Sequence, residues 1–370
     1  MSKMASSSVC RRLRRIVTAD AEKAASKLRK FQRIAAQFKK FSEKDSFRRR
    51  SDIYAFTVQR LSRSKSLIEE ILEHQKKYED ITNEIFTSRL IGLYGKAGML
   101  VHAQKLFDEM PQLNCPRTVY SFNVLLSAYV QTGTFDNVEE LFKVFPEKLG
   151  ITPDVITYNN VIKAYCEMGK FDSASLLFDE MENKGVEPSL ITFNTLLNAF
   201  YMNKRFADGE KLWGLMESKN VVPDVRSYNS RLRGLAFERR LVEAVELFDE
   251  MKNKGITPNV ISYNAMISGF IEDDNLKEVR NWYCKLKEDA MPDRVTYRTL
   301  IRFLCEKGDL GLALDLCIES INRNVIVGPS IVQSMVDELL KQSKDNEAKH
   351  LVNLVKSNKH FRSFHFALIK

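Results

Sequence analysis

The sequence predicts an all-α fold, an α-solenoid built from stacked helical hairpins. Three observations support this prediction. A self-similar segment recurs every 34 to 36 residues, and apolar residues inside each segment recur with the period of an α-helix. The chain also contains only 9 prolines and 15 glycines in 370 residues, few for a loop-rich β architecture. One hairpin cannot bury its own apolar face, so stacking against neighbours explains why the segment repeats.

The first 45 residues have the composition of a mitochondrial targeting segment, which we expect to be cleaved or disordered. Residues 1–19 contain four arginines and no acidic residue, and they lack the apolar core of a secretory signal. Residues 1–50 contain 16 Lys or Arg and 4 Asp or Glu, whereas the rest of the chain contains 41 and 44. The net charge of +9 therefore says nothing about the repeats. The competing interpretations of this segment are a disordered basic tail and a chloroplast targeting segment. The basic stretch 27–41 is either leader or retained helix.

Seven segments share the repeat register, which is set by a Tyr-Asn or Phe-Asn pair in most of them. They span residues 84–118, 119–154, 155–189, 190–224, 225–259, 260–293 and 294–328. Less regular segments lie on either side, at 46–83 and 329–370. We expect these two segments to be degenerate repeats that cap the ends of the array, the second one followed by a tail.

Each repeat predicts two helices. In the repeat 155–189, Tyr158, Val161 and Ile162 mark one face of the first helix, and Phe171 and Phe178 mark the second. A hydroxyl residue at the third position is expected to cap the first helix. These residues are Thr157, Thr192, Ser227, Ser262 and Thr296.

Two other features bear on the predicted hairpins. Gly185 and Gly255 stand where second helices should end. Arg231 occupies a core position of its repeat, so we expect its side chain to reach toward solvent and to loosen the packing there.

At these residues the sequence resembles the pentatricopeptide repeats of the P-class, over residues 84–328. The Tyr-Asn opening, the Asp-Glu-Met near the end of the second helix, the Lys-Gly turn and the closing Pro-Asp carry the resemblance. Tetratricopeptide repeats share the architecture, but their W…L-G…Y pattern is absent. The stretches EEILEHQKKYEDITNE, LFDEMPQLNCPRT and RSYNSRLRGLA also resemble short plant P-class proteins found with the small subunit of the mitochondrial ribosome. The resemblance implies a right-handed superhelix.

The resemblance further implies that the fifth and last residues of a repeat together face one base of single-stranded RNA. The pairs are Asn123/Asp154, Asn159/Ser189, Asn194/Asp224, Asn229/Asn259 and Asn264/Asp293. An amide carries both a donor and an acceptor, which suits the edge of an unstacked base. In the family's recognition pattern, Asn with Asp favours U, Asn with Ser favours C, and Asn with Asn favours either. The implied preference, read 5′ to 3′, is U-C-U-Y-U. Ser88/Thr118 and Arg298/Gly328 depart from the pattern, and we expect no defined base there.

The second residue of each repeat is implied to wedge between successive bases. These residues are Tyr120, Ile156, Ile191, Arg226, Ile261 and Val295. Apolar groups, an aromatic ring and a guanidinium plane can all stack on a base. The alternative interpretation is that the asparagines only cap helices or bond to nearby backbone.

The sequence predicts no catalytic residues, no cofactor and no metal. The six cysteines form no CxxC, the five histidines show no ligand spacing, and no phosphate-binding glycine loop is present. No apolar run approaches the length of a membrane helix, so we expect no membrane insertion. The chain also ends without room for a nuclease domain, so we expect no enzyme.

Three functions remain open at this point. The first is an RNA-contacting component of the small subunit of the mitochondrial ribosome, in the matrix, with ribosomal RNA or mRNA and ribosomal proteins as partners. The second is a free factor that binds a pyrimidine-rich organellar transcript for processing, stability or translation. The third is a helical scaffold that binds protein segments.

Overall fold

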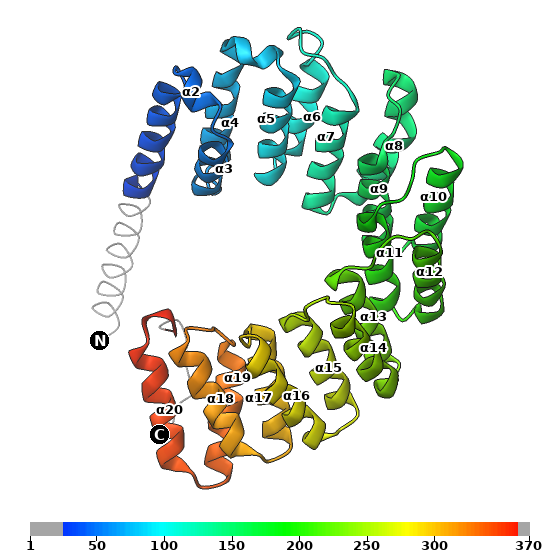
Figure 1. The fold of residues 1–370 in the computed structure, drawn as a ribbon. Coiled ribbons are helices and arrows are strands. Elements are labelled where there is room, and N and C mark those ends of the chain that lie inside the picture. The colour runs from blue at the N-terminus through cyan, green and yellow to red at the C-terminus, as the bar shows by residue number, and fades with distance from the viewer. Residues whose placement is uncertain (1–24, 362–370) are drawn as a thin grey trace, which may run out of the picture. The chain divides into compact units, whose positions relative to one another are not determined.

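The computed structural model describes residues 25–361, and within this range it contains helices and no strand (Figure 1). The chain divides into two compact units, Met1–Ser189 and Leu190–Lys370. Each unit is a stack of helical hairpins in which first helices pack on first helices, as the contacts of α5 with α7 and of α13 with α15 illustrate. The predicted all-α solenoid is confirmed.

The first unit begins with short helices and continues with three hairpins. The short helices are α2 (Asp45–Arg48), α3 (Ser51–Arg60), α4 (Lys65–Glu73), η1 (His74–Lys77) and η2 (Glu79–Thr82). The hairpins are α5 (Glu84–Lys96) with α6 (Leu100–Glu109), α7 (Val119–Thr132) with α8 (Phe135–Leu149), and α9 (Val155–Glu167) with α10 (Phe171–Asn183). Each first helix begins at the residue where its predicted repeat begins.

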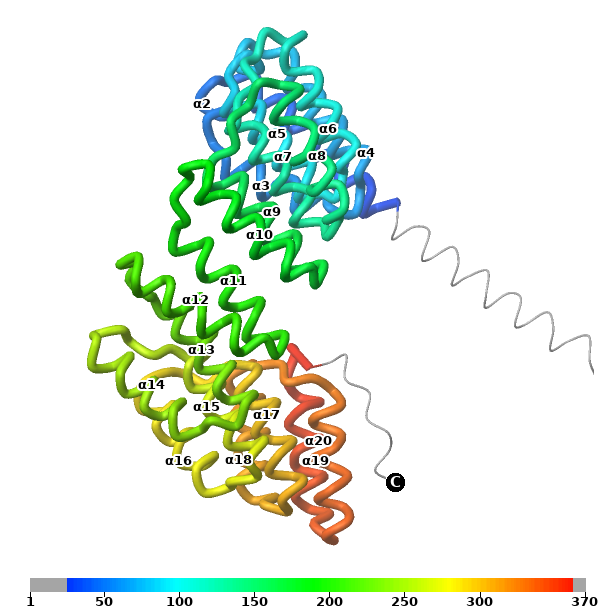
Figure 2. Tube along the Cα trace, turned by 90° about the vertical axis from the view of Figure 1, so that its right-hand side faces the viewer, coloured from blue at the N-terminus to red at the C-terminus, as the bar shows by residue number. Residues whose placement is uncertain are grey.

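The second unit holds five hairpins that follow one another along the stack (Figure 2). They are α11 (Leu190–Met202) with α12 (Phe206–Ser218), α13 (Val225–Phe237) with α14 (Leu241–Asn253), α15 (Val260–Glu272) with α16 (Leu276–Asp289), α17 (Arg294–Glu306) with α18 (Leu310–Asn322), and α19 (Pro329–Lys341) with α20 (Asp345–Ser357). The short η3 (Lys359–Phe361) follows. The C-terminal segment thus forms a complete hairpin.

Part of the predicted targeting segment is folded. Residues 1–24 lie outside the described residues, but residues 25–41 form a helix. The Phe38 ring is 3% exposed and packs edge-on against Tyr54, with the two centroids 4.8 Å apart. Residues 25–41 are thus folded and not disordered, which agrees with the retained-helix interpretation of 27–41, and Phe38 packs against α3.

The capping of the first helices differs from the prediction. The last residue of the preceding repeat, and not the hydroxyl at position three, is the N-cap: Asp154 Oδ1 accepts from the backbone N–H groups of Ile156 and Thr157. The Thr157 hydroxyl accepts in turn from the Asp154 N–H, which completes a capping box. The same box recurs at α13, α15 and α17.

Two further details concern the hairpins themselves. Gly185 and Gly255 end second helices with a left-handed backbone, each with φ +74°, as predicted. Arg231 does not loosen its repeat. Its guanidinium donates two hydrogen bonds to Glu210, of 2.9 and 2.7 Å, and lies 4.7 Å from the Trp213 ring centroid. An ion pair and an aromatic face replace the apolar contact that this position normally makes.

Candidate nucleic-acid interface

In four repeats the predicted pair is joined by a hydrogen bond from the asparagine amide to the last residue of the same repeat. The Nδ2 to Oδ1 distances are 2.8 Å for Asn123–Asp154, 3.0 Å for Asn194–Asp224, 3.2 Å for Asn229–Asn259 and 3.1 Å for Asn264–Asp293. These residues are 29 to 31 positions apart in the sequence. The helical hairpin between them brings the two predicted partners together.

The position-three hydroxyl of the following repeat fixes the other end of each asparagine amide by donating to its Oδ1. The bonds are Thr157 to Asn123 at 2.7 Å, Ser227 to Asn194 at 2.6 Å, Ser262 to Asn229 at 2.6 Å and Thr296 to Asn264 at 2.8 Å. Because the amide oxygen is occupied by a donor, the amide nitrogen must point to the capping residue. The pair is therefore oriented before any ligand arrives.

The outward atom of the capping residue is the accessible part of each pair. Oδ1 of Asp224 accepts from Asn194 and from the helix N–H groups, and no described residue bonds to its Oδ2. The same division holds for Asp154 and Asp293. Asn259 also caps through Oδ1, so its outward atom is the donor Nδ2. Asp thus presents an acceptor where Asn presents a donor.

The hydrogen bonds to Asp224 and Asp293 keep these two side chains ionised. Burial opposes ionisation of Asp224, but hydrogen bonds from the Ser227 N–H and the Asn194 amide outweigh it and hold the pKa of this carboxyl below its ordinary value. For Asp293, burial is likewise outweighed by the Thr296 N–H and the Asn264 amide, so its pKa is lowered too. Both side chains are therefore carboxylates at neutral pH, and each Oδ2 is an acceptor only.

The remaining predicted pair, Asn159/Ser189, lies at the equivalent positions, and Asn159 Oδ1 is buried without a hydrogen-bond partner among the described residues. Asn159 and Ser189 are both partly exposed, and Ser189 is the last residue of the first unit. Ser88 is fully buried, and its partner Thr118 is held by the Glu84 carboxylate through its N–H at 2.8 Å and its hydroxyl at 2.9 Å.

The Arg298/Gly328 pair differs as well. Arg298 is exposed, and Gly328 has φ +111° and no side chain to present. Neither this pair nor Ser88/Thr118 presents an oriented amide and cap.

The predicted wedge residues are exposed side chains at the start of the first helices in each of the two units. Their exposed fractions are 47% for Tyr120, 54% for Ile156, 64% for Ile191, 38% for Ile261 and 45% for Val295, and Arg226 is also exposed. Ile85 stands at the same position of the first repeat and is 60% exposed. Ile85 was not among the predicted wedge residues because the pair of its repeat departs from the pattern, although its position in the repeat register is the same. Large apolar groups that face water at one repeat position are available to a ligand, as are Val101 and Val242 at the second position of second helices.

Other kinds of site are not seen in the described part of the chain. Between residues 25 and 361, no three His, Cys, Asp or Glu side chains are grouped so that they could hold a metal ion. None of the helices in that range combines the length and apolar character needed to cross a bilayer.

Comparison with known proteins places these features in a family. The PPR repeat family matches residues 83–145, 153–202, 188–236, 223–272 and 258–306, and the PPR repeat matches residues 295–325. These matches cover more than half of the chain.

Two Arabidopsis thaliana relatives are similar over part of their length. The small ribosomal subunit protein mS78 (rPPR3a) is 48% identical over 154 residues, which are 41% of this chain and 39% of that protein. A pentatricopeptide repeat-containing protein named as mitochondrial is 45% identical over 143 residues, 36% of this chain and 34% of its own length. The matches thus span less than two fifths of these relatives.

The fold is also similar to a solved structure. The pentatricopeptide repeat protein PPR10 of maize, in a crystal structure with an 18-nucleotide psaJ RNA element, superposes with a TM-score of 0.51. The superposition covers 86% of this chain and 54% of PPR10, at 18% sequence identity. It supports the assignment of the fold.

Proposed function

Because the chain belongs to the PPR repeat family, we propose that it binds single-stranded RNA and reads one base with each Asn–cap pair. The observation that carries this proposal is the recurrence of one oriented pair in four repeats, with an unbonded polar atom facing outward each time. A helix cap alone would require only the Asp or Asn at the end of the repeat. It would not require the asparagine at the fifth position, whose amide is bonded to that cap. PPR10, with the same fold, was crystallised with RNA.

The outward atoms account for a choice between pyrimidines. Uracil presents an N3–H donor on its Watson–Crick edge, which complements the Oδ2 acceptor of Asp154, Asp224 or Asp293. Cytosine presents N3 as an acceptor, which complements the Nδ2 donor of Asn259. The exposed side chains at position two then stack on both faces of each base. No catalytic step, cofactor or metal forms part of this function.

We propose further that the protein works in the mitochondrial matrix as a component of the small ribosomal subunit. The 48% identity to mS78 and the identity to a protein named as mitochondrial support this assignment. Five bases at about 1–3 kcal/mol each give useful but not exclusive binding. Beyond residue 50 the chain has slightly more acidic than basic residues, so it supplies little nonspecific attraction to phosphates. Such a protein suits an assembly in which neighbouring proteins deliver it to its RNA.

Sedimentation tests this assignment. The tagged full-length chain, expressed in plant mitochondria, should migrate with the small ribosomal subunit in a sucrose gradient at moderate salt. It should stay with the small subunit after magnesium chelation separates the two subunits. Recovery only in light fractions would instead identify a free RNA-binding factor.

A further inference from the structure

A cleft of about 430 Å³ continues from the predicted base site of the repeat 260–293 toward the preceding repeat. At one end lie Ile261, Asn264, Asp293 and Val295, the wedge and pair residues of this site. At the other end lie residues of the last turns of α11 and α13, namely Met202, Arg233 and Phe237. Four small residues also line the cleft, Ala236, Ala265, Ser268 and Gly269. The volume of the cleft is therefore larger than a single base needs, because its lining extends beyond the wedge and pair residues.

Arg233 lies in this cleft without a partner of opposite charge. No hydrogen bond or ion pair to its guanidinium is found within residues 25–361, and burial alone lowers the pKa of this group. Arg231, two residues earlier on the same helix, is satisfied by Glu210. Partly burying a guanidinium costs free energy unless an anion compensates it. The Arg233 guanidinium therefore has no bonded anion, although the carboxylates of Glu272 and Asp293 also line the cleft.

The other side chains at this end suit an organic ligand more than a free ion. Phe237 is 50% exposed and Met202 is 43% exposed, and both line the cleft. Glu272 stands among the lining residues but is exposed, and it forms no ion pair with Arg233. Apolar walls next to one unpaired cation and one base-reading pair match a nucleotide, which has a flat apolar part and an anionic part.

We propose that this cleft holds one complete nucleotide, with its base on Asn264 and Asp293 and its 5′ phosphate on Arg233. This proposal rests on the proposed function and adds an anchor to it. Arg233 belongs to the repeat before the base-reading pair, so its phosphate is the one that joins the fourth and fifth nucleotides of the bound RNA. The guanidinium acts as a positioning group, because a bonded phosphate fixes which base enters the cleft.

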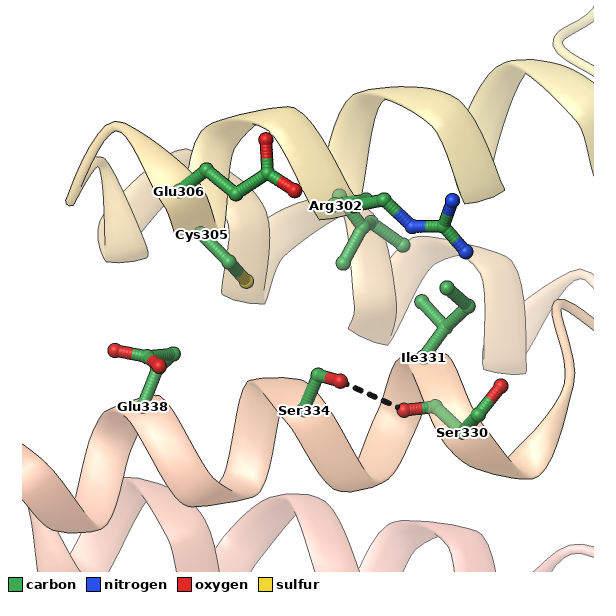
Figure 3. A pocket seen from close by; sticks show the side chains of 8 residues that line it. Arg302, Cys305, Glu306, Ser330, Ile331, Ser334 and Glu338 are labelled. Carbon is green, nitrogen blue, oxygen red and sulfur yellow. Dashed lines mark hydrogen bonds between the residues drawn. The ribbon is translucent and has the colours of Figure 1, made fainter.

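A second cleft in the same unit provides a matched comparison (Figure 3). It measures about 270 Å³ and lies between α17 and α19, where Arg302 occupies the same repeat position as Arg233. Arg302 is exposed, and Glu306 and Glu338 share its cleft. In the following hairpin Gln333 takes the position of Asn264, and it does not line this cleft. Unlike Arg233, Arg302 is therefore not a buried guanidinium, and no predicted base site lies beside it.

The test measures binding of the full-length chain to an RNA with the sequence U-C-U-C-U flanked by adenosines. Arg233→Met should weaken binding about tenfold, the effect of losing one charge-assisted hydrogen bond. It should also reduce the slope of log K against log salt by about 0.7, the value for one phosphate contact on a single strand. Arg302→Met should change the affinity by less than about twofold, and Glu272→Gln should strengthen binding by removing a like charge from the phosphate.

A neutral methylphosphonate placed at each linkage in turn identifies the phosphate. The wild-type chain should lose affinity most at the linkage between the fourth and fifth nucleotides, and Arg233→Met should be insensitive to that same change. If the wild type binds the RNA and Arg233→Met binds it equally well, the anchor is overturned while base reading stands, and the cleft is left for an acidic protein segment. If the wild type does not bind this RNA at all, the proposed function itself fails.

Discussion

Replacing Gly95 by alanine is expected to lower the free energy of unfolding of the first unit by about 2 kcal/mol, the cost of overpacking a tight interface. An added Cβ would lie 2.4 Å from Ala128 Cβ and 3.1 Å from Ala128 Cα. Both atoms are fixed to helix backbones, so no side-chain rotation relieves the clash, and α5 must move away from α7. This loss exceeds the gain of up to about 1 kcal/mol that alanine brings to a helix. Chemical denaturation followed by circular dichroism measures it.

The same helix offers the control. A Cβ added to Gly92 meets Val124 Cγ1 at 3.5 Å, an ordinary contact, so Gly92→Ala should be neutral or stabilising by up to about 1 kcal/mol. The double variant Gly95→Ala with Ala128→Gly exchanges the two methyl groups and should recover most of the lost stability. Equal stability of the Gly95→Ala and Gly92→Ala variants would show that α5 and α7 do not approach as closely as described.

Replacing Ile191 by aspartate is expected to weaken RNA binding about 10- to 100-fold without unfolding the protein. The side chain is 64% exposed, so little packing is lost, and an acidic residue in the first turn suits the N-terminus of α11. The loss in binding comes from stacking, worth about 1–3 kcal/mol per base, and from a new negative charge facing the RNA. Fluorescence anisotropy with a labelled pyrimidine oligonucleotide measures the affinity.

Val242→Asp is the matched control for Ile191→Asp. Val242 is also the second residue of its helix and is 74% exposed, but its helix, α14, is the second helix of a hairpin. It should bind RNA as the wild type does, within about twofold. Equal losses in both variants would mean that the effect is general charge repulsion and that the position-two residues of the first helices are not the contact surface.

Much of the fold could be predicted because it repeats. Eight hairpins show the same apolar spacing, so their first helices begin at residues 84, 119, 155, 190, 225, 260, 294 and 329, where the sequence pattern begins each segment. The pairing of Asn194 with Asp224 also follows from the period, because one hairpin length separates the two. Single residues that depart from the repeat pattern could not be interpreted from the period. Arg231 occupies an apolar position, and only the structure shows that its guanidinium bonds to Glu210 and lies against the Trp213 ring.

The rest could not be predicted because it depends on contacts that do not repeat. The cleft beside Asn264 takes residues from four helices, and no periodic pattern marks Met202, Arg233 and Phe237 as neighbours. The helix at 25–41 has the composition of a leader, and its packing through Phe38 is a tertiary effect. The cap was assigned to the wrong residue because Thr157 and Asp154 are both good capping types, three positions apart. The structure shows that they act together.

Asp224→Asn tests most directly whether the outward atom of the capping residue selects the base. Asparagine keeps the cap through its Oδ1, as Asn259 does at α15, so the stability should stay within about 0.5 kcal/mol. The measurement is the ratio of affinities for two RNAs, U-C-U-C-U and U-C-C-C-U, which differ only at the base that faces this pair. The wild type should prefer the uracil by about tenfold, and the variant, whose Asn–Asn pair favours either pyrimidine, should lose this preference, because an acceptor has become a donor. If both chains bind the two RNAs in the same ratio, the Asn–cap pairs stabilise helix ends and do not read bases.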